Sequence, residues 1–296
     1  MFKSLAILAL LSSSVWAQSS DSASQTASAS SSLPSGDVSK TCRKFMKSLD
    51  SDDSLANCIA PFISASAAYA PGGSGSSGGV KDTLDTLCNA DGCDASTIQG
   101  KLADFYSACS DELTSSNAGV IDVYDAMYAL SPLKTAMCSK GDNGEYCMLA
   151  INKYASGDDV QAAQHALSSD STTNMTGKAF ASYNIPFLFL RDSVDSNYLC
   201  TTCTRSILSA YIDYESDSPY APGISSSRLI SGQSDLYKGV SSQCGASFLS
   251  GAVQAAGGLK NDSPFSNNNG AARGASAYGM GAGALVAAAS ALVLML

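Results

Sequence analysis

The sequence predicts an all-α fold, a single disulfide-stapled helical domain with a disordered Ser-rich N-terminal segment. From Thr41 to Gly258 the apolar residues recur at helical spacing, and alternation with a period of two is almost absent. The chain also holds ten cysteines, an even number that suits a cross-linked domain. Its 296 residues are enough for one domain with a substantial core between two terminal processing signals.

The first 17 residues have the layout of a secretory signal peptide. Lys3 supplies the positive charge, residues 5–15 the apolar stretch, and residues 15–17 a Val-Trp-Ala cleavage site, so we expect cleavage before Gln18. The alternative, a short buried helix, is disfavoured because a Ser-rich coil follows. Residues 18–40 are mostly Ser, Ala and Thr and cannot bury enough apolar surface to fold. We expect a disordered O-glycosylated stalk there, or else a bare linker.

Helices are expected to begin soon after Thr41. Ser51 is placed to cap a helix through Asp52 and Asp53, whose charges suit a helix N-terminus. The Pro-Gly-Gly and Ser/Gly run at residues 71–79 should end this section in a loop.

The clearest amphipathic pattern covers residues 98–109. Ser96 and Gln99, just before and within it, have the spacing of a capping box. A second helical pattern covers residues 120–130, and Pro132 should kink or interrupt that helix because proline lacks a backbone N–H.

The second half of the domain continues the helical pattern. We expect a helix over residues 158–167, and a buried helix rather than a buried strand for the apolar run at 185–190. A helical stripe follows at residues 199–211 and is broken by the Asp-Ser-Pro sequence at 217–219. The last candidates are residues 229–240 and 248–256, and the Gly257-Gly258 pair then closes the domain.

The cysteines predict five disulfides, because an even number in an oxidising compartment is normally paired. Connectivity is left open by the sequence, with one local exception. Cys138 and Cys147 flank a loop rich in Gly and Asn that should bring their sulfurs together. The ten residues are Cys42, Cys58, Cys88, Cys93, Cys109, Cys138, Cys147, Cys200, Cys203 and Cys244.

The C-terminal residues 270–296 have the layout of a GPI-attachment propeptide. Small residues at Asn269 and after it suit the attachment point, a spacer of small residues follows, and residues 284–296 form an apolar tail. The alternative is a transmembrane helix, but a span needs about 20 predominantly apolar residues, and no Lys or Arg follows to hold a cytoplasmic end. We therefore predict lipidation at Asn269, reached through a linker over residues 259–269.

Two sequons predict N-glycosylation. Asn174-Met-Thr and Asn261-Asp-Ser both fit the acceptor rule, although the proline after the second disfavours its use.

The sequence singles out no catalytic residue, metal ligand or cofactor. Cys200 and Cys203 form a CxxC motif, which in this secreted chain we interpret as two structural cysteines that pair with different neighbours. Zinc would require a second such motif or a histidine pair, and His165 is the sole histidine. It is expected on a solvent-facing helix surface rather than as a general base.

Three pairs of acidic residues have the type that glycoside hydrolysis uses. Helix capping accounts for Asp52-Asp53 and Asp158-Asp159 without any chemistry, and Asp213 with Glu215 is the third pair. The sole tryptophan, Trp16, lies in the signal peptide, so a sugar cleft would depend on tyrosine and phenylalanine.

Several cysteine contexts resemble a known group of proteins. They include TCRKFMKSLDSDDSLANC at Thr41, LCTTCTRSILSAYIDYESDSPYAPG at Leu199 and CGASFLSGAVQAAGG at Cys244. The chain from Thr41 to Gly258 resembles fungal secreted, GPI-anchored, cysteine-rich proteins that carry a domain of unknown function. The resemblance implies a fungal cell-surface location and brings no catalytic residues with it.

These observations predict a GPI-anchored cell-surface or cell-wall glycoprotein with a structural or interaction role. Its partners would be the membrane, through the anchor, and components of the cell wall, and it would lie at the extracellular face of the plasma membrane or in the wall. The net charge of −9 without a basic cluster argues against nucleic acid. The alternatives are a small-molecule or lipid-binding module, favoured by an internal apolar cavity, and a carbohydrate-modifying enzyme, favoured by two carboxylates in an open cleft lined by tyrosines.

Overall fold

Helix α5 (Ala118–Met137) forms the centre of the structure. Buried residues occur on all its sides, including two acidic ones, Asp122 and Asp125. A helix that is apolar all round belongs in a protein interior, and other helices accordingly cover α5. It packs against α4 (Ala95–Thr114), α9 (Thr202–Asp217) and the 3₁₀ helix η4 (Ile185–Phe187).

The computed structural model describes residues 38–49, 52–69, 79–160, 181–218, 220, 222 and 227–249. Within these ranges the fold is helical and contains no strand, which confirms the predicted all-α class. An isolated antiparallel bridge joins Lys140 and Tyr146. No helix within the described ranges is long and apolar enough to cross a membrane.

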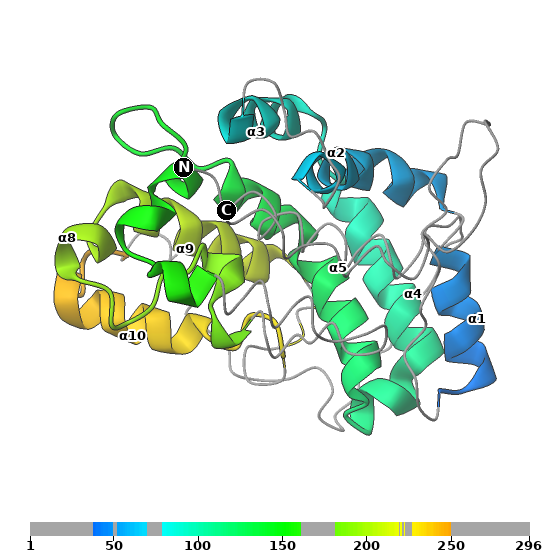
Figure 1. Cartoon of the computed structure of the whole chain (residues 1–296). Helices are drawn as coiled ribbons and strands as arrows, with labels where there is room; N and C mark the ends of the chain where they lie inside the picture. Colours follow the sequence, from blue (N-terminus) through cyan, green and yellow to red (C-terminus); the bar gives the residue numbers. More distant parts are fainter. Residues whose placement is uncertain are drawn as a thin grey trace.

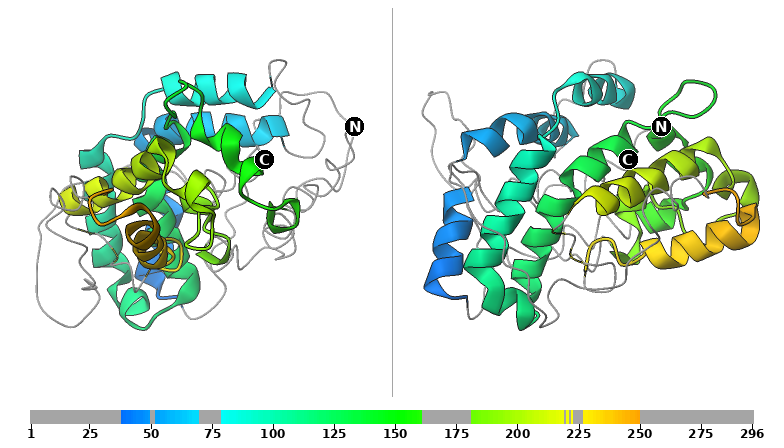
Figure 2. Two further views of the ribbon diagram at one scale, coloured as in Figure 1. Left: turned by 90° about the vertical axis from the view of Figure 1, so that its left-hand side faces the viewer. Right: turned by 180° about the vertical axis from the view of Figure 1, so that it is seen from behind.

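On one side of α5, helices α1 (Lys40–Ser48) and α4 extend the packing outward, and the three run side by side in Figures 1 and 2. Aromatic rings connect them in sequence. Phe45 of α1 meets Phe105 of α4, and Phe105 meets Tyr124 of α5, each pair edge to face with ring centroids 5.3 Å apart. Such edge-to-face pairs add to the stabilisation from burial, so these rings fix how the helices approach.

On the other side of α5, α9 lies against it, and α8 (Ser196–Leu199) and α10 (Gln233–Cys244) lie farther out (Figure 1). The ring of Tyr128 on α5 meets that of Tyr214 on α9 at a centroid distance of 5.1 Å. A second 3₁₀ helix, η3 (Cys147–Lys153), follows the loop after α5.

Helices α2 (Asp53–Tyr69) and α3 (Gly79–Asn89) pack together across one end of the α1, α4 and α5 group (Figure 1). Asp52 caps α2, because its carboxylate accepts hydrogen bonds from the backbone N–H groups of Ser54 and Leu55 at 3.0 and 3.1 Å. The same carboxylate forms an ion pair with Lys101 of α4, and both side chains are largely buried. Burial by itself would raise the pKa of Asp52, but the hydrogen bonds from Lys101 and Ser54 outweigh it and hold that pKa below the usual value.

All ten cysteines form disulfides, as predicted, and none of them is free. Each bridge joins two separate elements rather than closing a local loop. The predicted pairing of Cys138 with Cys147 is wrong: the loop between them does reverse, but each sulfur reaches a helix from elsewhere in the chain. The pairs are Cys42–Cys109, Cys58–Cys93, Cys88–Cys138, Cys147–Cys203 and Cys200–Cys244.

Several helix boundaries differ from the sequence prediction. Helix α4 begins at Ala95 after Asp94, so Ser96 is inside the helix and the capping-box prediction is wrong. Helix α5 continues past Pro132 to Met137, so the predicted interruption does not occur. The stripe at 199–211 is divided between α8 and α9, and α10 begins four residues later than expected, at Gln233.

The apolar run at 185–190 is neither the expected α-helix nor a strand. It forms the short η4 followed by two residues with left-handed backbone, Leu188 (φ 52°) and Phe189 (φ 63°). Such angles are costly for bulky residues and persist only when the surroundings enforce them. Here the buried Asn184 closes the turn, since its carbonyl accepts from the N–H of Phe189 at 3.0 Å and its side-chain amide donates to the Leu190 carbonyl at 2.8 Å.

Other predictions lie wholly or partly outside the described residues. These are the signal peptide, the Ser-rich segment, Ser51, residues 161–167 with His165, Asn174, residues 250–258, Asn261, the linker and Asn269. Of the helix expected at 158–167, residues 157–160 are described and are helical, with the Ser156 hydroxyl accepting from the N–H of Asp159 at 3.0 Å.

The ion pair between Asp52 and Lys101 gives a test of how α2 is held. We expect Lys101→Met to lower the free energy of unfolding by about 3 kcal/mol, because a carboxylate is then left buried without its cation. Lys81→Met is the matched control: the Lys81–Asp85 pair is exposed and within one helix, so its loss should change the free energy of unfolding far less than Lys101→Met does. Urea unfolding measures both, and equal losses for the two variants would contradict the assignment.

Candidate functional site

Two buried carboxylates of α5 hold the segment that leads into α10. Asp125, 1 % exposed, accepts hydrogen bonds on one oxygen from the Ser227 hydroxyl and the Arg228 N–H, both at 2.7 Å. One helical turn earlier, Asp122 lies 3.4 Å from the Arg228 guanidinium. Burial raises the pKa of Asp125 to about 7 despite these hydrogen bonds, and the nearby Asp122 charge adds to the rise.

A third buried carboxylate belongs to α9. Glu215 accepts a hydrogen bond from the side-chain amide of Gln233, the first residue of α10, at 3.0 Å. Burial raises the pKa of Glu215 to about 7, and the Gln233 hydrogen bond opposes this rise. Burial raises the pKa of the Tyr128 hydroxyl, and the negative charge of Glu215 raises it further.

The carboxylates of Asp125 and Glu215 both act on the Tyr128 hydroxyl, and further polar side chains of α5 and α9 lie nearby. The hydroxyls of Ser131 and Ser218 lie near that of Tyr214 and lower its pKa, although burial raises that pKa overall. No pocket described below includes Asp125, Tyr128 or Glu215 in its lining, so we interpret these groups as part of the core's support and not as a substrate site.

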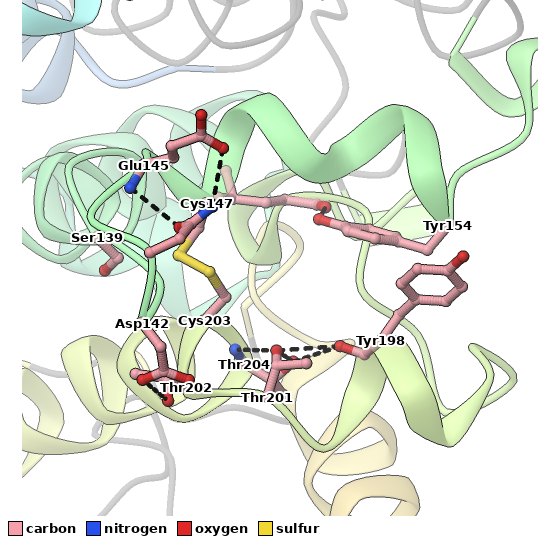
Figure 3. The surroundings of a disulfide bond; sticks show 12 residues. Ser139, Asp142, Glu145, Cys147, Tyr154, Tyr198, Thr201, Thr202, Cys203 and Thr204 are labelled. Carbon is pink, nitrogen blue, oxygen red and sulfur yellow. Dashed lines mark hydrogen bonds between the residues drawn. A yellow bond between two sulfur atoms is a disulfide. The ribbon is translucent and has the colours of Figure 1, made fainter.

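An open pocket with a different character lies at the side of the molecule formed by η3, the turn after η4, and α8. Its volume is about 220 Å³, and Tyr198 of α8 is its most exposed large apolar side chain, with 40 % of its surface accessible. Tyr154, just after η3, lies beside Tyr198, with ring centroids 6.3 Å apart (Figure 3). The remaining lining residues are Lys153, Ala155, Asp159, Phe189, Arg191, Ser193, Val194 and Asp195. We call this the aromatic pocket.

Charged groups of both signs line the aromatic pocket. Arg191 forms an ion pair with Asp159 at 3.5 Å, and each side chain is about one third exposed. The guanidinium of Arg191 also lies over the ring of Tyr183 at 5.7 Å. Asp195 caps α8 by accepting a hydrogen bond from the Asn197 N–H at 2.8 Å. These groups offer hydrogen-bond donors and acceptors beside the tyrosine rings.

The aromatic pocket is positioned by the strained turn and by a disulfide. The Tyr154 hydroxyl donates to the carbonyl of Leu188 at 2.8 Å, which fixes the Tyr154 ring against the left-handed residues Leu188 and Phe189. Behind it, Cys147–Cys203 ties η3 to α9, as Figure 3 shows. Gly141 packs close to this bridge, where a Cβ would lie 3.3 Å from the Cys203 sulfur. Because backbone strain tends to gather at binding sites, this turn marks the pocket as the best candidate site.

The residues that the sequence singled out do not assemble into one site. Cys200 and Cys203 pair with different partners, as predicted, and they lie at the end of α8 and within α9. Asp158 and Asp159 open a helix, and Asp159 alone reaches the aromatic pocket. Asp213 is exposed, whereas Glu215 is largely buried.

A metal is not indicated by the geometry of the described residues. Cys42, Cys109 and Glu112 are the group whose ligand atoms come together there, but both sulfurs are in one disulfide. Glu112 instead accepts a hydrogen bond from the Ser39 N–H at 2.5 Å, which ties the start of α1 to α4. Burial would raise the pKa of Glu112, and the hydrogen bonds with Ser39 outweigh that effect and lower it.

Sequence reasoning missed the pocket residues Tyr154, Arg191 and Tyr198, and the buried acids Asp122 and Asp125. The acids carried a detectable signal, because charged residues on the apolar face of a predicted helix are unusual and are paired when buried. The sequence gives no such signal for the pocket residues, because they come together only through the turn at 184–190, which was not predicted.

The fold and its cross-links define a class of protein, a disulfide-stapled helical domain of the kind found in extracellular or secreted proteins. Residues 25–253 match the family described as domain of unknown function DUF7729, and the chain belongs to this family. The match begins within the Ser-rich segment and ends close to the predicted boundary at Gly258. Neither a curated protein nor a solved structure matches the chain.

The buried acids predict that folding stability is highest at acidic pH. The folded-state pKa values of Asp125 and Glu215 lie above the ordinary 3.8 and 4.5, so their contribution is fully present below those values and is lost as the pH rises through about 7. Asp52 and Glu112 have lowered pKa values and act in the opposite direction, because their contribution is lost as the pH falls below about 4. We expect a maximum near pH 4–5.

Urea unfolding between pH 4 and pH 8 measures this dependence. For each acid, the free energy of unfolding falls by up to about 1.4 kcal/mol per pH unit over the range in which the acid is protonated in the folded state and ionised in the unfolded state. Asp125→Asn should flatten the decline between pH 5 and 7, whereas Asp235→Asn, a change at an exposed carboxylate of α10, should leave it unaltered. Stability that rises over that interval would show that these acids do not govern it.

Proposed function

We propose that the protein is a GPI-anchored cell-surface or cell-wall glycoprotein whose helical domain binds carbohydrate of the wall at the aromatic pocket. The observation that carries the proposal is the pairing of the half-exposed Tyr198 with Tyr154 in an open pocket that also contains Arg191 and Asp159. The layout of residues 270–296 supports the anchor, and the Ser-rich segment and two sequons support glycosylation.

Carbohydrate is the ligand class that this combination of groups suits. The C–H groups on the face of a sugar ring carry partial positive charge and pack against the negative face of an aromatic ring. The sugar hydroxyls around the same ring both donate and accept hydrogen bonds, and Asp159, Arg191 and Lys153 offer matching groups. At about 220 Å³ the pocket is smaller than the about 300–1,000 Å³ of pockets that enclose drug-sized ligands. It therefore suits one residue of a longer chain.

Binding is favoured over hydrolysis of the sugar. A glycosidase needs one carboxylic acid that can donate a proton and a second carboxylate that acts as a base or nucleophile. Asp159 is engaged with Arg191, and Asp195 is engaged with the N-terminal N–H groups of α8. The two buried acids with pKa values near 7, Asp125 and Glu215, lie outside the pocket lining. The carbohydrate-modifying enzyme is therefore the weaker alternative.

The carbohydrate proposal predicts that Tyr198→Ala abolishes or weakens binding at least tenfold. Loss of one stacking ring removes both the packing and the shape of the pocket wall. The measurement is retention of the purified protein on immobilised wall polysaccharides, followed by calorimetric titration with oligosaccharides from the fraction that retains it.

Leu149→Ala provides the matched control, because Leu149 is a large apolar side chain of similar exposure (39 %) that does not line the pocket. It should bind as the unaltered protein does. Retention that is equal for the unaltered protein and Tyr198→Ala would rule out the aromatic pocket as the binding site.

The anchor is tested separately. A phosphatidylinositol-specific lipase should release the protein from intact cells, because the lipid would be its sole attachment once residues 270–296 are removed. Mass spectrometry of the released protein should find Asn269 at its C-terminus. Protein that stays in the membrane with Leu296 intact would contradict the anchor without affecting the carbohydrate site.

A further inference from the structure

A second pocket lies between α2, the connection from α3 to α4, and α5. Its volume is about 510 Å³, within the range of pockets that enclose a small molecule. Its walls are mainly carbon and sulfur: Phe62 and Leu130 line it, together with cysteines from two disulfides. These are Cys88 and Cys138 of one bridge and Cys93 of the bridge to Cys58. We call this the lysine pocket, and it shares no lining residue with the aromatic pocket.

Lys134 of α5 carries the single formal charge among the residues that line the lysine pocket. Its ammonium donates a hydrogen bond to the carbonyl of Ala90, and Gly92 lies beside the side chain, since a Cβ there would be in ordinary contact with Nζ at 3.8 Å. Burial lowers the pKa of Lys134, and the charge of Asp91 opposes this fall. The ammonium is thus partly removed from water and held by a neutral acceptor.

Two of the three hydroxyl groups in this lining are used as donors to the helix backbone. Thr135 donates to the Ser131 carbonyl at 3.1 Å, and Ser139 donates to the Thr135 carbonyl at 2.9 Å. The third, that of Ser131, lies near the Tyr214 hydroxyl, so Lys134 is the charged donor that this lining offers to an anion. An anionic group gains most where the cation is poorly solvated, because a charge-assisted hydrogen bond is stronger in a less polar environment.

We propose that the lysine pocket binds an amphiphile of the fatty carboxylate class, with its carboxylate at Lys134 and its chain against Phe62, Leu130 and the disulfides. This site goes beyond the proposed carbohydrate binding and does not depend on it. The apolar walls stabilise the chain through burial at about 25 cal/mol per Å² of apolar surface, and the lysine selects the charge. A neutral or cationic amphiphile of equal length brings no negative charge to the ammonium of Lys134.

Calorimetric titration of the whole purified protein tests whether binding depends on the negative charge of the ligand. The ligands are dodecanoate and dodecanol, both used below the concentrations at which they aggregate. Lys134→Met keeps the apolar stem and removes the charge, and we expect it to weaken dodecanoate binding about 10- to 100-fold. Its affinity for dodecanol should be unchanged. Lys238→Met, at an exposed lysine of α10, is the matched control and should not alter binding of either compound.

A second pair of variants tests the location independently of charge. Gly92→Leu adds a side chain beside Lys134 in the pocket, whereas Gly100→Leu adds the same side chain to open space on α4. Dodecanoate binding should be lost in the first variant and kept in the second, with unchanged circular dichroism in both. The proposal is overturned if the unaltered protein does not bind dodecanoate, if dodecanol binds it equally well, or if Lys134→Met and Gly92→Leu both retain full affinity.

Discussion

The burial of α5 on every side is the constraint on which the rest of the structure depends. A helix that is buried on every side over residues 120–130 must be covered by several other elements, and α4, α9 and η4 provide that cover. Because α5 also carries two acids into the interior, the cover must supply hydrogen-bond donors as well as apolar surface. Asp125 obtains them from Ser227 and Arg228, about a hundred residues later in the chain. The hydrogen bonds to the buried Asp125 therefore fix the path of the segment before α10.

The disulfides act on the layer around this centre. They join α1 to α4, α2 to the segment before α4, α3 to the end of α5, η3 to α9, and α8 to α10. None of them links α5 directly to α4 or α9, where packing and the aromatic contacts already provide cohesion. The short elements α8 and η3 bury too little surface to hold their place by packing alone. Disulfides at these elements lower the conformational entropy of the unfolded chain and so stabilise the folded state.

Sequence patterns predicted the helical class and the complete pairing of the cysteines, because helical periodicity and cysteine number are local or compositional properties. They failed where a distant contact decides the outcome. Pro132 does not interrupt α5, because the tightly packed surroundings of that helix outweigh the loss of one backbone hydrogen bond. Residues 185–190 look like an ordinary apolar segment, yet the buried Asn184 and the Tyr154 hydroxyl hold them in a turn. The cysteine pairing and the aromatic pocket were unpredictable for the same reason.

The two pockets open from the cross-linked layer around α5. The aromatic pocket is built on η3, the turn after η4, and α8, and the lysine pocket is walled by two disulfides beside the last turns of α5. Phe62, Leu130 and Phe189 belong both to these linings and to the core, whereas exposed lining residues such as Tyr198 and Lys153 can change with little cost to the fold. The left-handed residues Leu188 and Phe189 lie in the turn beside the aromatic pocket, so their backbone strain is carried outside the long helices. Both proposed ligand sites therefore lie beside the central helices, in elements that the disulfides hold in place.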